Sequence, residues 1–477
     1  MQTILNGPHL ARAVAPTPPS RAQRARLTCP CGRCLSGRGS RGQQPPGGSS
    51  LRKSFHTLPG AALGVTGVMK GTILIAGILL SFAFTTVQGR CETGDQPDTP
   101  AVTLDDGVNF IAADGQSKLT VQGWIMVDAA ILDGESDVKN YVGDPLDDDI
   151  ELREARLMLN ATLFDFIDGV FEYNFSDAEP NFKDVYIGIS EIPYLGKVKL
   201  GHMKEPFSLE ELTSLSHITF MERGLPNAFA PGRNLGFQIQ NNAMDQRLTW
   251  AIGGFLELTD LDEGYDEDKL FDVAARVTGL PLWEEEGRRL LHLGISYLHT
   301  SAEEGASITY KASPESYLAE VSFVDTGPIA SDDADIINPE MAIVYGPFSL
   351  QAEYMHAFVD DADGSNPHFS GYYIFGSYFL TGEHRRYEKK KAIFGRVKPL
   401  ADFNPFKGGW GALEIALRYS FIDLEDGTLR NEDLEDWTLG LNWYFNKHIK
   451  LMGNYIYSHL DDVGDSNILQ TRLQIYF

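Results

Sequence analysis

Runs in which apolar and polar side chains alternate recur along the chain after residue 90. From 437 to 445, one face of such a run would carry Trp437, Leu439, Leu441, Trp443 and Phe445. The intervening positions are mostly polar or small, and the same pattern occurs at 154–163 and 411–422. A period of two is typical of a β-strand. No apolar run after residue 90 approaches the ~20 residues of a membrane-spanning helix, so the pattern predicts an all-β fold.

The alternation fits both a soluble β-sandwich and an outer-membrane barrel. Three features favour the barrel. An apparent export signal precedes the alternating region. The runs are closer to the ~10 residues of a tilted membrane strand than to the ~5–6 of an average strand. The chain also ends on alternating Leu469, Thr471, Leu473, Ile475 and Phe477, which resembles the C-terminal signal of bacterial outer-membrane proteins. We therefore predict a transmembrane antiparallel β-barrel, with Trp443, Tyr476 and Phe477 in an interfacial aromatic girdle.

Counting the runs predicts the number of strands. The predicted strands are 117–133, 150–163, 168–176, 182–190, 196–204, 234–242, 246–258, 270–278, 290–300, 338–346, 348–358, 370–381, 410–424, 434–445, 449–460 and 467–477. They number sixteen, and bacterial barrels have an even number of strands. Two further runs, 317–324 and 391–398, are assigned to connections, and including both would give eighteen.

The first 89 residues have a different composition. They hold ten Lys or Arg and no acidic residue. Residues 69–89 combine Met69-Lys70, an apolar stretch and small residues near the end, as a bacterial signal peptide does. We expect 1–68 to be an upstream extension that is not native and is disordered, with a transit peptide as the alternative. Residues 90–116 are then a periplasmic N-terminal segment and 117–477 the barrel.

The part of the chain after residue 89 is strongly acidic. It carries 30 basic and 66 acidic residues, a net charge of −36. Such a chain is a poor candidate for nucleic-acid binding, which needs a basic surface. Most acidic clusters fall in connections expected on the outer side, at 133–149, 260–268, 325–335, 360–363 and 461–465. These loops either form a solvated surface or bind divalent cations.

Three connections are too long to be simple turns: 205–234, 301–339 and 382–409. The last holds eight basic residues and three acidic ones. Arg and Lys side chains around a pore select anions, and arginine matches phosphate oxygens with two parallel donors. The charge alone leaves two interpretations open, an anion-guiding segment and a solvated periplasmic turn.

Several stretches are similar to the phosphate-selective porin O and P family. They are REARL at 153–157, FKDVYIG at 182–188, KEPFSLEE at 204–211, ITFMERGLP at 218–226, PGRN at 231–234, SPES at 313–316, FVDTG at 323–327, YFLTGE at 378–383, FGRVKP at 394–399, GGWGA at 408–412 and LGLNWY at 439–444. The resemblance extends from about residue 105 to the C-terminus. It implies a 16-stranded barrel, usually trimeric, narrowed by loops three and five and by a long periplasmic turn. It also implies basic residues in the lumen that guide phosphate-like anions.

The resemblance and the strand parity together give the candidate residues. Arg223 and Arg233 match basic positions of the family's loop-three motif, and Lys311 precedes SPES. The predicted pore-lining and anion-binding residues are Arg156, Arg223, Arg233, Lys311, Arg385, Arg386, Lys389, Lys391, Arg396, Lys398 and Arg418. Acidic residues share the lumen face at Glu154, Glu172, Asp184 and Glu414, so the predicted pore is mixed in charge.

The predicted function is passive diffusion of phosphate or similar small anions through a homotrimeric porin in the lipid of the bacterial outer membrane. Two alternatives stay open, a general or cation-preferring porin and a largely plugged structural barrel. No P-loop, GxSxG or HExxH motif occurs. We therefore expect no enzymatic activity, catalytic residue, metal or cofactor.

Overall fold

The structure is a computed structural model that describes residues 100–104, 106–176, 181–257, 270–302, 306–361, 364, 366–426 and 433–477. All of them belong to one compact unit of the chain, 69–477. The predicted extension and signal peptide lie outside the described residues. No helix in the described ranges has both the length and the apolar character needed to cross a membrane.

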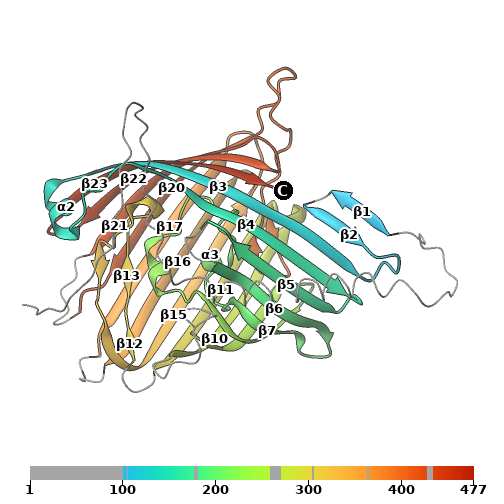
Figure 1. The fold of residues 1–477 in the computed structure, drawn as a ribbon, viewed down its shortest axis with the longest axis horizontal. Helices are drawn as coiled ribbons and strands as arrows, with labels where there is room; N and C mark the ends of the chain where they lie inside the picture. The colour runs from blue at the N-terminus through green and yellow to red at the C-terminus, as the bar shows by residue number, and fades with distance from the viewer. Residues whose placement is uncertain are drawn as a thin grey trace, which may run out of the picture. The chain divides into compact units, whose positions relative to one another are not determined.

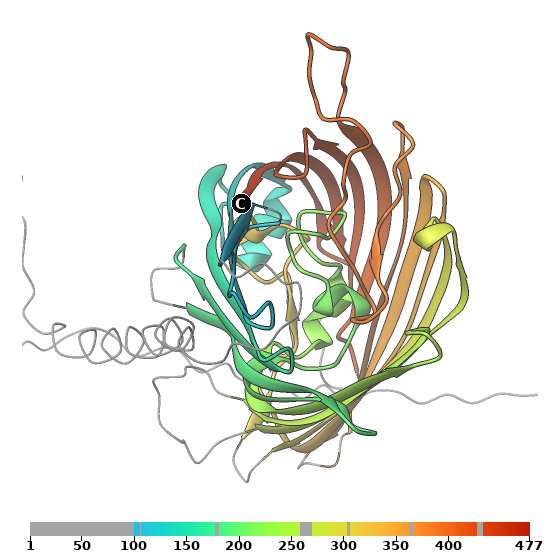
Figure 2. The same cartoon turned by 90° about the vertical axis from the view of Figure 1, so that its right-hand side faces the viewer.

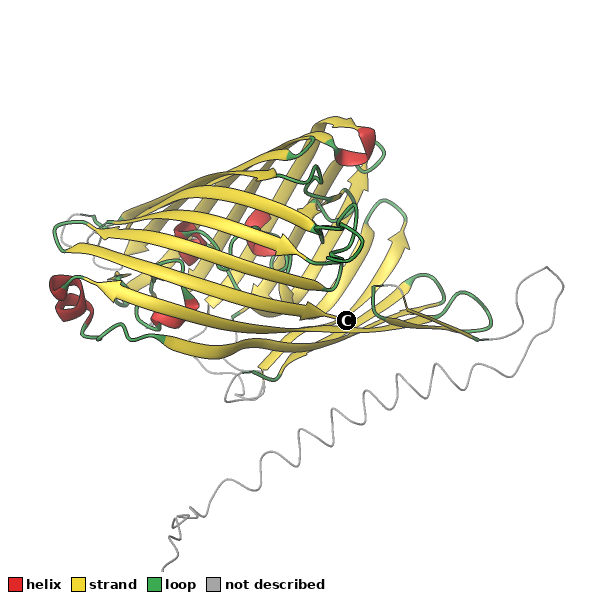
Figure 3. Cartoon of the chain, turned by 90° about the horizontal axis from the view of Figure 1, so that it is seen from above, coloured by secondary structure: helices red, strands yellow, loops and turns green. Residues whose placement is uncertain are grey.

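Sixteen antiparallel strands form a closed barrel (Figures 1 and 3). They are β3 (Lys118–Gly134), β4 (Asp149–Leu163), β5 (Ile167–Asn174), β6 (Asn181–Ile192), β7 (Gly196–Lys204), β8 (Arg233–Ala243), β9 (Leu248–Leu256), β10 (Leu270–Glu284), β11 (Arg289–Ala302), β15 (Ile329–Tyr345), β16 (Phe348–Asp361), β17 (His368–Phe379), β20 (Ala412–Asp423), β21 (Leu434–Tyr444), β22 (Ile449–Leu460) and β23 (Gly464–Tyr476). Each pairs with the next in this order, and β23 pairs with β3 to close the ring.

Each of the sixteen predicted strands falls on one of these strands, which confirms the barrel. The two runs that were assigned to connections contribute only short elements there. They are the 3₁₀ helix η3 (Tyr317–Ala319), β14 (Val324–Asp325) and β19 (Ile393–Phe394). The count of sixteen is therefore correct, and eighteen is not.

The apolar face of each strand points away from the lumen. On β21, Leu439 and Leu441 are 55% and 53% exposed, whereas Thr438 and Asn442 are buried. This arrangement matches a barrel whose outer surface meets lipid. The prediction for Tyr476 is wrong: its ring is buried and stacks on Trp124 at a centroid distance of 5.9 Å. Its parity places it inward, between the outward-facing Ile475 and Phe477.

Several shorter helices and strands lie outside the sixteen barrel strands. The hairpin of β1 (Ala101–Leu104) and β2 (Val108–Ile111) precedes the barrel, and β2 pairs with β3. Helix α2 (Ser136–Val142) lies in the connection from β3 to β4 and ends at Gly143, whose φ of 72° suits glycine. The remaining short elements are α3 (Leu209–Leu212), η1 (Leu225–Phe229), η2 (Glu285–Gly287), β12 (Ser307–Ile308), β13 (Lys311–Ala312) and β18 (Tyr387–Glu388).

Three long connections enter the ring of strands. We call them loop 3 (205–232), loop 5 (306–328) and the long turn (380–411). Loop 5 is shorter than predicted because β15 begins at Ile329. In an up-and-down barrel, loops 3 and 5 start from one end and the long turn from the other. Figure 2 shows loop 3, with helix α3, inside the ring. The packing of these segments against the wall creates the candidate site.

Candidate functional site

Helix α3 of loop 3 is held against the wall by one glutamate. The carboxylate of Glu353 on β16 accepts hydrogen bonds from the backbone N–H groups of Leu209, at 3.0 Å, and Glu210, at 2.8 Å. The first N–H groups of a helix have no partner within the helix, so a wall carboxylate satisfies them here. Asn338 and Tyr373 also donate to Glu353, at 2.9 and 2.6 Å.

A buried arginine connects loops 3 and 5 to the same strand. Arg418 on β20 has no exposed surface. Its guanidinium lies 3.3 Å from the carboxylate of Glu210 in loop 3 and donates to Glu315 in loop 5 at 2.9 Å. It also donates to the carbonyl of Glu222 at 3.0 Å. One guanidinium thus uses its planar set of donors to fix both loops.

Glu222 forms a second anchor for loop 3. Its carboxylate pairs with Arg153 on β4 at 3.0 Å and with Arg472 on β23 at 2.6 Å. Arg472 in turn pairs with Asp128 on β3 at 2.7 Å. Burial acts to raise the pKa of Glu222, but the charges and hydrogen bonds of Arg153 and Arg472 outweigh it and lower the pKa to about 2. The carboxylate is therefore ionised at neutral pH.

Loop 5 is fixed through its backbone as well. The N–H of Glu315 donates to Asp436 on β21 at 2.9 Å, and the carbonyl of Glu315 accepts from Gln470 on β23 at 2.9 Å. The Glu315 side chain accepts from Thr438. The SPES segment is therefore a tight wall contact rather than an open turn.

The long turn also packs into the barrel. Arg276 on β10 pairs with Glu340 on β15 at 2.7 Å and donates to the carbonyl of Ala392 at 3.0 Å. Arg385 is 4% exposed, donates to Gln351 at 2.9 Å, and its guanidinium lies 3.7 Å from the centre of the Phe394 ring. Much of the turn therefore lies inside the barrel.

Several predicted site residues are ion-paired rather than open to solvent. In addition to Arg418, Arg156 on β4 pairs with Glu154 and, at 2.6 Å, with Glu172. Arg223 pairs with Glu211 at 3.1 Å, and Arg233 with Asp184 at 2.5 Å. The acidic residues that parity assigned to the lumen are thus partners of the arginines, except Glu414, which accepts from Asn442 and Tyr444.

The basic residues of the long turn do not form one ring. Lys389 pairs with Asp245 at 3.3 Å, and Lys391 pairs with Glu388 at 2.9 Å. Arg396 and Lys398 each lie 3.3 Å from the carboxylate of Asp106. Arg386 in this turn and Lys311 in loop 5 are exposed. The eleven predicted residues are therefore spread over three environments: wall ion pairs, turn contacts and solvent. No group of three or more His, Cys, Asp or Glu is arranged to hold a metal ion among the residues that the structure describes.

Comparison with known proteins agrees with this geometry. Residues 129–477 match the model of the family described as phosphate-selective porin O and P. The chain belongs to this family. It is a porin of the bacterial outer membrane.

The chain is similar in sequence to two known proteins and similar in fold to one solved structure. Porin O of Pseudomonas aeruginosa is 27% identical over 59% of this chain and 70% of its own length. An uncharacterized protein of Caulobacter vibrioides is 26% identical over 72% of this chain and 68% of its own length. The in-vitro folded outer-membrane protein OmpT of Vibrio cholerae superposes with a TM-score of 0.50 at 13% identity, over 76% of this chain and 98% of that one. This last similarity concerns the fold alone.

Some lumen cations of this family member were not among the predicted site residues. Arg153, Arg276 and Arg472 are wall arginines that hold the loops, and Lys199 and Lys450 also face inward. For most of them, the alternation of the strand in the sequence already indicates that the side chain faces inward. Arg472, for example, lies between Thr471 and Leu473, which belong to the outward-facing alternating series, so parity alone places it in the lumen.

Proposed function

We propose that this porin conducts small anions of the phosphate type. The observation that carries the proposal is that three inward basic side chains have no carboxylate partner among the residues that the structure describes. The lumen carboxylates of Glu154, Glu172 and Asp184 are each paired with an arginine.

Three inward cations are compensated less well. Lys199 lies over the ring of Tyr186 at 5.1 Å, Arg385 donates to an amide, and Lys450 donates to the carbonyl of Ile218 at 3.1 Å. Within the described part of the chain, none of the three forms an ion pair. A confined cation without a counter-charge attracts a mobile anion. Membership of a phosphate-selective family and similarity to Porin O support the same conclusion.

The test is the reversal potential in a planar lipid bilayer under a KCl gradient, with phosphate then added as a blocker. The protein would begin at residue 90, where the signal peptide is predicted to end. We expect anion preference and block of chloride current by phosphate. Lys199→Gln, Arg385→Gln and Lys450→Gln should each reduce the preference, whereas Lys407→Gln, an exposed residue of the long turn, should not. Cation preference without block would overturn the proposal and favour a general or cation-preferring porin.

A largely plugged structural barrel is the second candidate. It is favoured by the extent to which loops 3 and 5 and the long turn are buried, including Phe207, Phe229 and Phe394, each at most 2% exposed. In the same bilayer experiment, a plugged barrel would insert without a measurable unitary current. If the protein is instead an open channel, the bilayer current should rise in discrete steps as single barrels insert.

We also propose that the protein acts as a homotrimer. The family resemblance supports this. The outer face of β4 and β5 also carries the small residues Ala155, Ala161 and Gly169, beside which a second copy of the chain can pack closely. Mass measurement of the detergent-extracted protein tests the assembly. A monomeric mass under non-denaturing conditions would overturn it without affecting the proposed conduction.

A further inference from the structure

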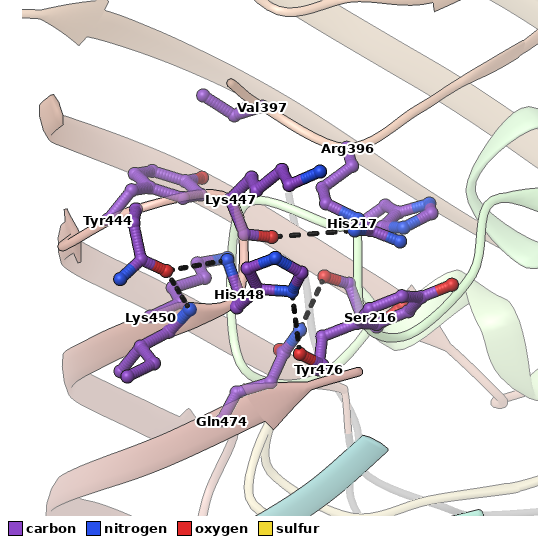
Figure 4. Close-up of a pocket in the computed structure, with 12 residues that line it drawn as sticks. Ser216, His217, Arg396, Val397, Tyr444, Lys447, His448, Lys450, Gln474 and Tyr476 are labelled. Carbon is purple, nitrogen blue, oxygen red and sulfur yellow. Dashed lines mark hydrogen bonds between the residues drawn. The ribbon is translucent and has the colours of Figure 1, made fainter. Parts of the chain in front are cut away.

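The long turn divides into an inward half and an outward half. In the inward half, Arg396 and Val397 line a small pocket together with His217 of loop 3 and with residues at the ends of β21, β22 and β23 (Figure 4). The residues that follow cross the rim of the barrel. From residue 400 onward the turn contacts the outer face of the wall, so residues 400–411 lie on the other side of the strands from the pocket.

Two outward-facing aromatic residues at the end of β21 hold the outward half. The ring of Phe403 packs edge-on against Trp443, with 5.1 Å between the ring centres, and lies 5.4 Å from the ring of Phe445. The backbone N–H of Phe403 donates to the carbonyl of Phe445 at 2.6 Å, and the indole N–H of Trp443 donates to the carbonyl of Trp410 at 2.8 Å. Trp443 belongs to the same outward series as Leu439. The base of the segment is therefore attached to the apolar outer face.

Residues 404–409 form a tight hairpin with a defined shape. Asn404 and Gly409 pair through two backbone hydrogen bonds, at 2.9 and 3.1 Å. The side-chain oxygen of Asn404 accepts from the backbone N–H groups of Phe406 and Lys407, each at 3.1 Å. A side chain that bonds the backbone two residues further on stabilises a turn. The hairpin thus presents its tip in one direction.

The hairpin and its base expose large apolar side chains. Phe406 at the tip is 97% exposed, Leu400 is 70% exposed and Trp410 is 64% exposed. Lys407 follows Phe406 at the tip and is also exposed. Clustered exposed apolar side chains mark a site of contact with a membrane or with another protein.

The position of the hairpin favours lipid as its partner. It is continuous with the apolar outer face through Trp443, at the level where membrane barrels carry a girdle of aromatic residues. Aromatic rings are favoured at the membrane interface, and a lysine can keep its apolar stem there while its ammonium group reaches the headgroups. The face proposed for the trimer contact, on β4 and β5, is separated from β21 by β22, β23 and β3. A second copy held there leaves the hairpin uncovered.

We propose that residues 400–411 form a lipid-binding arm. The arm inserts Phe406 and Trp410 into the phospholipid leaflet beside the barrel and places the ammonium group of Lys407 near the lipid phosphates. We expect this leaflet to be the periplasmic one, because the long turn is predicted on that side. One continuous segment then packs inside the barrel with its first half and attaches the same rim to the membrane with its second half. The inference does not depend on which ions the porin conducts.

The test measures the depth of the hairpin tip in a membrane. Phe406→Cys is labelled with a fluorophore in the protein that begins at residue 90, with Cys91→Ser so that the label has a single site. The porin is reconstituted into vesicles of phosphatidylcholine and phosphatidylglycerol, with or without phospholipid that carries a nitroxide in the upper part of its acyl chains. We expect the nitroxide lipid to quench the fluorophore strongly and aqueous iodide to quench it little. Because the Phe406 side chain is almost fully exposed, its replacement removes little packing within the chain.

Glu286→Cys is the matched control, since Glu286 is exposed in the short turn η2 at the same end of the barrel. Its label should be quenched by iodide and not by the lipid. Heat-dependent migration in gel electrophoresis shows that each variant has formed a closed barrel.

The deciding quantity is the ratio of lipid quenching to iodide quenching at the two positions. A higher ratio at Phe406→Cys than at Glu286→Cys supports the arm. An equal or lower ratio would overturn it, because the tip would then lie in water with the other turns. Protection of Phe406→Cys from both quenchers would also overturn it, since protein would then cover the hairpin. Energy transfer between donor-labelled and acceptor-labelled copies would identify that cover as a second copy of the chain.

Discussion

Arg418 on β20 and Glu315 in loop 5 form an ion pair that is closed to solvent, with 2.9 Å between Nε and Oε2 and side chains that are 0% and 1% exposed. The same guanidinium reaches Glu210 in loop 3. Loops 3 and 5 are therefore held against the wall by a buried charge network and not by apolar packing alone. Such a network strongly penalises the removal of one partner, because the other charge is left buried and uncompensated.

Arg418→Gln should destabilise the protein by about 3–5 kcal/mol, the usual cost of breaking a buried pair. Loops 3 and 5 should then move more freely, and the unitary current should become larger and noisier. Bilayer recordings and urea unfolding in lipid vesicles measure the two effects. Arg289→Gln is the control, since its pairs with Glu284 and Glu285 are about half exposed and contribute ~0–1 kcal/mol. Equal stabilities of the two variants would contradict the role given to Arg418.

The anchor at Glu222 predicts a dependence on acid pH. Its pKa is about 2 in the folded protein and 4.5 without the surrounding structure. A depressed pKa stabilises the fold fully above the unfolded value, and this contribution is lost as pH falls from about 4.5 toward 2. We expect loop 3 to become accessible to an acid-active protease such as pepsin over this range. In Glu222→Gln, cleavage in loop 3 should change less between pH 5 and pH 3 than in the wild type.

The sequence was sufficient for the barrel because every membrane strand repeats the same two-residue pattern. It failed where that pattern stops. β15 begins at Ile329, nine residues before the predicted start. The sequence missed this part of the strand because alternate positions there hold Ser331, Asp333 and Asp335 rather than apolar residues. These residues continue the backbone ladder after the apolar band has ended.

The candidate site was predictable only in part. Strand parity shows that Arg156 and Arg418 face inward, but it does not show which carboxylates they pair with. Arg472 pairs with Asp128 across 344 positions, and Arg396 with Asp106 across 290. These partners come together only when the barrel closes and the connections fold inward. The sequence thus predicted a set of cations, while the distribution of their counter-charges required the structure.

Asp106 should hold the long turn to the N-terminal hairpin. Burial acts to raise its pKa, and the charges of Arg396, Lys398 and Lys447 outweigh it, so the net shift is downward. Asp106→Asn should release this contact and loosen the pairing of β2 with the start of β3, so that trypsin cleaves more readily after Lys118. The effect should shrink in high salt, because the exposed part of the cluster is screened. Glu191→Gln, at an exposed residue near the end of β6, is the control. Identical cleavage of the two variants would show that the carboxylate does not hold the hairpin.

The outward direction of the apolar face predicts a depth-dependent penalty for charge. Leu439 lies mid-strand on β21 and is 55% exposed, whereas Leu451 lies near one end of β22 and is 38% exposed. Arginine on the lipid face costs about 2–4 kcal/mol at the bilayer midplane and ~0–1 kcal/mol near the interfaces. We therefore expect Leu439→Arg to lower the free energy of unfolding in lipid vesicles by several times more than Leu451→Arg. Leu439→Phe, which keeps the apolar contact with lipid, should have little effect. If both arginine variants unfold at the wild-type urea concentration, the apolar face does not contact lipid.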